Sequence, residues 1–112
     1  MAAADLTTLA ELLRSSGMLL SVQGAADGVA LGGVRFDSRE VSAGDLFVAI
    51  AGAETDGHLH CAAAVDRGAA ALIVERPLPE LRVPQLVVGS SRSAMALAAA
   101  WLFGFPSREL GV

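Results

Sequence analysis

The chain has 112 residues, 54% of them hydrophobic and 18% charged, which suits a single packed domain with one hydrophobic core. Its formal charge of −4 lacks the basic excess of a protein that binds a phosphate backbone, so we expect no nucleic-acid partner. All basic side chains apart from two histidines are arginines, and the absence of lysine excludes Schiff-base chemistry and the lysine of a phosphate-binding P-loop.

The first predicted element is a short amphipathic helix. Leucines recur at helical spacing between residues 6 and 13, Thr7 or Thr8 is placed to cap the helix, and Gly17 is placed to end it. A short strand over residues 19–22 follows. The next stretch, residues 24–33, is rich in Gly and Ala and indicates a loop or a weak hairpin.

A strand, a turn and a second strand are predicted next. Residues 34–36 alternate apolar and polar side chains, and residues 42–45 have the composition of a turn. The apolar run over residues 46–50 is then expected to form a buried strand. Polar residues 37–39 follow the first of these strands directly.

The second half of the chain predicts helices alternating with short apolar strands. An Ala-rich helix is expected over residues 59–67, stopped by Gly68, followed by a strand over residues 69–74. Three prolines stiffen the connection to a strand at 85–88. A helix over residues 93–103, capped by Ser90 or Ser91, completes the series.

This order of elements predicts an α/β fold. Strands that alternate with helices favour a layered sheet with right-handed crossovers, and short apolar strands fit a sheet covered on both faces. We therefore expect a layered mixed or parallel sheet of about five strands, flanked by helices.

The composition also bears on location. The single Cys61 cannot form an internal disulfide and lies among apolar residues, where we expect it to be buried. The chain shows no signal-peptide pattern, and its most apolar stretch, residues 94–105, is shorter than the roughly 20 residues of a membrane-spanning helix. We expect a soluble cytoplasmic protein without a membrane partner.

Polar residues at the end of a predicted strand are the first candidate site. Asp37, Ser38 and Arg39 stand where α/β proteins place ligand-binding residues, although Asp and Ser also form ordinary structural turns. The polar loop at residues 53–57 allows the same two interpretations. Arg92, near a helix start, either binds a phosphate or is an ordinary solvated surface residue.

Other candidates favour structural roles. His58, His60 and Cys61 do not have the spacing of a four-ligand zinc site, so we expect no metal, with one histidine exposed and the cysteine buried. Trp101 and Phe103 are expected in the core. No nucleophile elbow, zinc pattern or P-loop appears, and we predict no catalytic residue in this chain.

A long motif nevertheless resembles a known family. Residues 36–49 read FDSREVSAGDLFVA, and Gly52 and the run Asp56-Gly57-His58 follow. Together these resemble the opening domain of the MurE and MurF ligases of peptidoglycan synthesis. The similarity continues through residues 68–71, 74–75 and 83–84 and covers about residues 33–112. The tail, with Ser-Arg-Ser-Ala at 91–94 and Phe-Pro-Ser-Arg-Glu-Leu at 105–110, favours the MurE type.

The resemblance implies a single UDP-substrate-binding N-terminal domain over residues 1–112, with the ATP-binding central domain and the C-terminal domain beyond the end of this chain. A MurE-type ligase uses ATP and Mg²⁺ to activate a carboxylate of UDP-N-acetylmuramoyl-L-alanyl-D-glutamate as an acyl phosphate, which the third amino acid of the stem peptide then attacks. The chain alone is expected to be inactive and to hold no cofactor.

The family's uridine diphosphate contacts, carried over by position, fall on five residues of this sequence: Phe36, Ser38, Ala53, Glu54 and Thr55. A uracil ring needs an apolar wall and a few hydrogen-bond partners, which Phe36, the loop backbone and Ser38 are suited to provide. Arg39 either contacts the diphosphate or is a structural ion-pair partner. The MurF type and a stand-alone binding or interaction module remain the alternatives. The sequence does not decide between diaminopimelate and lysine as third amino acid.

Overall fold

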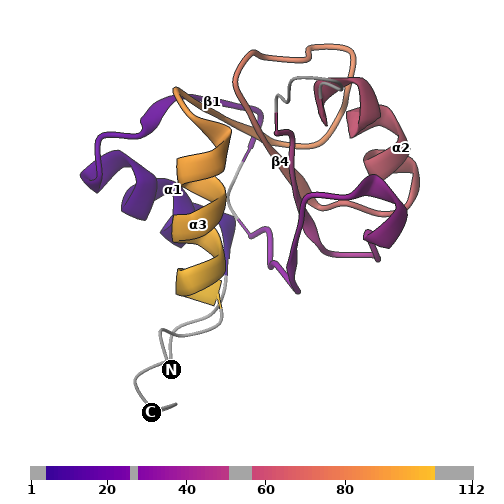
Figure 1. Cartoon of the computed structure of the whole chain (residues 1–112), viewed down its shortest axis with the longest axis horizontal. Helices are drawn as coiled ribbons and strands as arrows, with labels where there is room; N and C mark the ends of the chain where they lie inside the picture. The colour runs from indigo at the N-terminus through magenta and orange to yellow at the C-terminus, as the bar shows by residue number, and fades with distance from the viewer. Residues whose placement is uncertain (1–4, 26–27, 51–56, 103–112) are drawn as a thin grey trace.

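The computed structural model describes residues 5–25, 28–50 and 57–102 (Figure 1). In chain order the elements are α1 (Leu6–Ser15), β1 (Leu19–Gln23), β2 (Val34–Arg35), the 3-10 helix η1 (Ser38–Glu40), β3 (Leu46–Val48), the 3-10 helix η2 (Gly57–His60), α2 (Cys61–Asp66), β4 (Ala71–Val74), β5 (Gln85–Val88) and α3 (Ser91–Leu102). Within the described residues, five strands form one sheet in the order β1-β5-β4-β3-β2. The strands from β2 to β5 are parallel and β1 is antiparallel to β5. The predicted α/β class and mixed sheet are confirmed.

Alternation along the buried strands divides the core into two layers. Successive side chains of a strand point to opposite faces, so Leu46, Val48 and Ile73 join the cluster under α1 and α3, and Phe47, Leu72 and Val74 join the cluster under α2. All of these side chains are buried. Figure 1 accordingly shows α1 and α3 on one side of the sheet and α2 on the other.

The predicted stripe of α1 is confirmed, because Leu6, Leu9 and Leu13 are fully buried against the sheet. The predicted cap is wrong. Asp5 is the N-cap, with extended backbone angles and a carboxylate that accepts the backbone N–H of Thr8 at 2.9 Å. Thr7 and Thr8 themselves lie in the first turn. Hydrogen bonds from Thr8, its side chain first and its backbone second, lower the pKa of Asp5.

The end of α1 is set by Gly17, as predicted. Gly17 has a φ of +77°, and its N–H donates to the carbonyl of Arg14 at 3.0 Å. The N–H of Met18 donates to the carbonyl of Leu13 at 2.9 Å. These two bonds form a Schellman motif, in which a left-handed residue reverses the chain. The chain therefore turns directly from α1 into β1.

Most other boundaries shift by a few residues. The strand predicted from residue 69 begins at Ala71, because the N–H of Ala69 still bonds the α2 carbonyl of Ala64 at 3.0 Å. The predicted helix over residues 59–67 consists of η2 followed by α2. Helix α3 begins at Ser91, two residues earlier than predicted. In the described ranges, no helix is long and apolar enough to cross a membrane.

Candidate functional site

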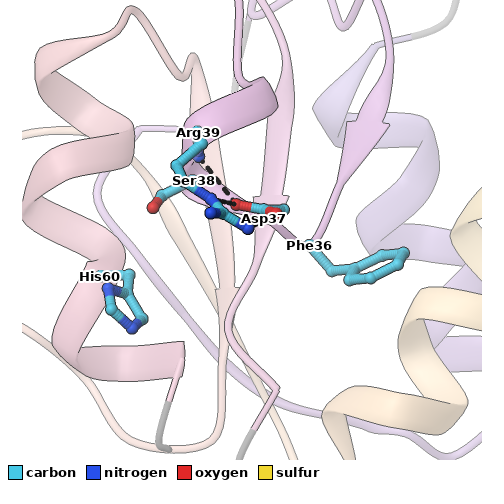
Figure 2. A pocket seen from close by; sticks show the side chains of 5 residues that line it. All are labelled: Phe36, Asp37, Ser38, Arg39 and His60. Atoms are coloured by element: carbon cyan, nitrogen blue, oxygen red, sulfur yellow. Dashed lines mark hydrogen bonds and ion pairs between the residues drawn. The ribbon is translucent and has the colours of Figure 1, made fainter.

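Because β2, β3, β4 and β5 are parallel, their carboxyl ends meet at one edge of the sheet, the usual position of ligand sites in α/β proteins. An open pocket of about 400 Å³ lies where the chain leaves β2. Its lining residues are Phe36, Asp37, Ser38, Arg39 and His60 (Figure 2). Three of the predicted contact residues, Phe36, Ser38 and Arg39, thus lie together.

Asp37 shapes the wall of this pocket by capping η1. Its Oδ1 accepts the backbone N–H of Arg39 at 3.0 Å, and its carbonyl accepts the N–H of Glu40 at 2.9 Å. The next residue, Val41, is buried in the cluster under α2. The turn that carries Ser38 and Arg39 is therefore fixed at both ends.

Arg39 is oriented by the same carboxylate. Its Nε donates to Asp37 Oδ1 at 3.0 Å and its Nη2 donates to Asp37 Oδ2 at 2.8 Å. This side-chain hydrogen bond, then the backbone N–H of Arg39, and then weaker attraction to Arg39 and His60 lower the pKa of Asp37 to about 2. The Asp37 carboxylate in turn raises the pKa of Arg39. The structural ion pair, one of the two roles predicted for Arg39 from the sequence, is thus present. The other edge of the guanidinium still carries N–H groups that can bind a ligand.

Ser38 differs from its neighbours in its side chain, since its structural hydrogen bond is made by the backbone carbonyl, which accepts the N–H of Val41 at 3.4 Å. The residue is only 9% exposed and lines the pocket, yet its Oγ makes no hydrogen bond to any residue of the described chain. In those same residues, every fully buried side-chain nitrogen or oxygen atom has a hydrogen-bond partner. The Ser38 oxygen has none, so it is not fully buried and it reaches the pocket. The turn chemistry predicted for Asp37 and Ser38 therefore belongs to Asp37, and a donor and acceptor at Ser38 face the pocket.

Phe36 provides an apolar surface beside these polar groups. It follows β2 directly and is 64% exposed, an unusual state for a large aromatic side chain. Figure 2 shows Phe36 on one side of η1 and His60 on the other, with Asp37, Ser38 and Arg39 between them. The pocket thus combines an aromatic ring, a hydroxyl, a carboxylate and two basic side chains.

The two histidines have different surroundings. His58 is buried, and its Nε2 accepts the backbone N–H of Glu75 at 2.9 Å, whereas His60 is exposed at the pocket. Cys61 is fully buried, so the prediction of one exposed histidine and a buried cysteine is confirmed. The described residues contain no group of three or more His, Cys, Asp or Glu side chains that could hold a metal. The sequence did not identify His60 as a pocket residue, since only the fold brings η2 next to η1.

Glu75, at the end of β4, joins the same edge to α3. Its Oε2 accepts the backbone N–H of Ser91 at 2.8 Å and the Ser91 hydroxyl at 2.9 Å. Of the two predicted caps of α3, Ser90 is the one that caps the helix, because its Oγ accepts the N–H of Ser93 at 3.3 Å. Arg92 is exposed in the first turn of α3. Ala53, Glu54 and Thr55, the predicted loop contacts, lie outside the described residues, so their role stays a prediction.

The sheet thus carries a mixed polar and aromatic pocket at its carboxyl edge, the usual position of ligand sites in α/β proteins. Comparison with known proteins defines the family. Residues 31–101 match the model of the Mur ligase family, catalytic domain, and the chain belongs to this family.

Two curated relatives are UDP-N-acetylmuramoyl-L-alanyl-D-glutamate–2,6-diaminopimelate ligases. The ligase of Chlorobium phaeobacteroides is 39% identical over 108 residues, which are 94% of this chain and 21% of that protein. The ligase of Halalkalibacterium halodurans is 48% identical over 77 residues, 69% of this chain and 16% of that protein. The chain therefore spans about a fifth of the length of the curated relatives it matches.

A solved structure, MurF from Acinetobacter baumannii, aligns with a TM-score of 0.68 and 26% identity over 84% of this chain and 20% of that one. The resemblance to the Mur ligases is thus confirmed by sequence and by fold. The motif at residues 36–49 lies within the matched segment.

Proposed function

We propose that this chain is the substrate-binding N-terminal domain of a MurE-type ligase, and that its pocket binds the uridine diphosphate end of UDP-N-acetylmuramoyl-L-alanyl-D-glutamate. The observation that carries the proposal is Ser38, a residue only 9% exposed whose hydroxyl reaches the pocket and makes no hydrogen bond in the described structure. Such a group gains a partner when a ligand binds.

The uracil and the diphosphate of the ligand each have a counterpart in the pocket. The exposed ring of Phe36 offers an apolar surface to the uracil, and Ser38 offers a hydrogen bond. Arg39, held by Asp37 through its Nε and Nη2, presents its outer N–H groups to the diphosphate. Ala53, Glu54 and Thr55 are proposed to complete the uridine contacts.

The names of the sequence relatives support the MurE type over the MurF type, because the two relatives described above act on UDP-N-acetylmuramoyl-L-alanyl-D-glutamate by name. The third amino acid of the stem peptide is proposed to be added by the whole ligase, in the cytoplasm. A stand-alone binding module is the alternative. The gene sequence beyond residue 112 distinguishes the two, because only the ligase hypothesis predicts that it continues into a glycine-rich ATP loop.

ATP and Mg²⁺, the proposed cofactors of the whole enzyme, do not fit the residues of this chain. The sequence contains no lysine and no P-loop, and the described residues offer no cluster of potential metal ligands. We therefore propose that both bind in parts of the ligase outside these 112 residues.

A UDP titration of the 112-residue chain, followed by backbone NMR and thermal unfolding, tests the proposal. A fragment that holds only the nucleotide end should bind weakly, with Kd near about 1 mM, or roughly 4 kcal/mol. At tenfold excess of UDP over that Kd the fold gains about 1.4 kcal/mol, a rise in Tm of roughly 6 °C. Amide signals of Phe36, Ser38 and His60 should move. CDP at the same concentration is the matched control for base recognition. If UDP moves neither the Tm nor these signals, the pocket is not the nucleotide site.

A further inference from the structure

The charges that line the pocket nearly cancel without His60. Asp37 and Arg39 are paired at 2.8 Å, and the low pKa of Asp37 keeps its carboxylate ionised near neutral pH. The pair therefore contributes one negative and one positive charge to the same small volume. A diphosphate carries two negative charges, so it meets little net attraction from this pair alone.

His60 is the remaining basic group in the lining. It stands on η2, across the pocket from η1, and both 3-10 helices pack on α2. The backbone at His60 is therefore positioned beside the turn that carries Arg39, while the imidazole itself is exposed. Histidine is the side chain whose charge ordinarily changes between about pH 5 and 8.

Building on the proposed function, we propose that His60 is an affinity-determining residue of the pocket, which gives it a net positive charge when protonated and so strengthens the binding of a nucleotide diphosphate. The imidazolium adds a second donor on the side opposite Arg39, so that the two flank the bound anion. Binding of the uracil and ribose does not involve this charge.

The other charged groups nearby do not replace His60. On η1, Asp37 and Arg39 engage each other, and Glu40 acts on Arg39 through its charge. At the end of β4, the Glu75 carboxylate is engaged by Ser91. Along α2, Asp66 is the last residue and Arg67 the C-cap, at the end of the helix remote from His60. Among the described residues that line the pocket, Arg39 and His60 are the basic side chains.

UDP-N-acetylglucosamine is the suitable probe, because its diphosphate is esterified at both ends and keeps its charge across this range. Its affinity for the 112-residue chain is measured by calorimetry or NMR at pH 5.5 and pH 8. We expect binding about fivefold tighter at pH 5.5, near the upper end for an exposed charge interaction. His60→Gln should bind at both pH values as the unchanged chain does at pH 8, and His60→Lys should bind tightly at both. Arg92→Gln removes an exposed cation outside the pocket and should leave the pH profile unchanged.

Uridine, which has no phosphate, is the ligand control, and its affinity should be equal for the unchanged chain and for His60→Gln. Binding of UDP-N-acetylglucosamine with the same pH profile in both proteins would overturn the role of His60 and leave the proposed function in place. Absence of binding by the unchanged chain at either pH would overturn the proposed function and this inference with it. Because His60 is exposed, its substitution should leave the Tm unchanged, which thermal unfolding of each variant checks.

Discussion

Replacing Ser38 with alanine separates a ligand-binding hydroxyl from a structural one. The side chain is nearly buried, lines the pocket and makes no hydrogen bond to the described residues. Its removal should therefore leave the free energy of unfolding within about 0.5 kcal/mol of the original value. A lost hydrogen bond to the ligand costs about 0.5–1.5 kcal/mol, which raises the Kd for UDP by roughly 2- to 12-fold.

Calorimetric titration with UDP gives the Kd, and urea unfolding without ligand gives the stability. Ser42→Ala is the matched control, because Ser42 is exposed in the turn before β3, and its structural hydrogen bond to Asp45 uses the backbone N–H, which alanine keeps. Neither quantity should change in that variant. A Ser38→Ala chain that loses more than about 1 kcal/mol of stability and binds UDP unchanged would refute the reasoning and make the hydroxyl structural.

Three further substitutions test the described framework. Glu75→Ala removes the acceptor of two hydrogen bonds at the start of α3 and should lower the free energy of unfolding, measured in urea, by about 2–3 kcal/mol. Glu80→Ala, on an exposed residue, is the control and should change it almost not at all. Equal losses of stability in the two variants would contradict this role of Glu75. At Gly68 the backbone has a φ of +106°, and an added Cβ would lie only 2.7 Å from the backbone of the 42–45 turn. At Gly17 the φ is +77° and an added Cβ would meet open space, so Gly17→Ala should destabilise the fold by about 1 kcal/mol. Gly68→Ala should destabilise it more, because strain and a steric clash add. Because the pKa of Asp37 is about 2 when folded, below its ordinary 3.8, the stabilisation it gives is present above pH 4 and is lost as the pH falls toward 2. Asp37→Asn should therefore flatten the stability profile between pH 4 and pH 2, and an unchanged acid profile would show that the pair does not affect folding.

The strands and helices could be predicted because their signals are local. Apolar runs at 46–50 and 85–88 mark strands that are buried on both faces. Gly17 marks the end of a helix, because it takes the left-handed backbone conformation that stops α1. The helix cap was mispredicted because Asp5, Thr7 and Thr8 are all chemically suited to it, and only backbone angles decide which residue stands just outside the helix. The antiparallel direction of β1 likewise has no local signal, since the side-chain period of two is the same in both directions.

The candidate site was predictable only where it follows a strand. Ser38 and Arg39 could be named because polar residues directly after a strand fall at the carboxyl edge of a parallel sheet. Which of Asp37 and Ser38 closes the turn depends on side-chain orientation, which the sequence does not encode locally. His60 belongs to another element, and its place in the pocket arises from the packing of η1 and η2 on α2.

The pairing of β1 with β5 has a consequence for the order in which the chain can fold. Residues 19–23 form their ladder with residues 85–88, so the first strand of the sheet must wait for the last one to be synthesised. Helix α1 contacts both β1 and α3, and its buried leucines share a core with residues of α3. Such long-range contacts slow folding, because the loop between them must close before they form. On the ribosome, β1 therefore lacks its ladder partner until residues 85–88 have been synthesised, and α1 lacks its contact with α3 until the last described helix has emerged.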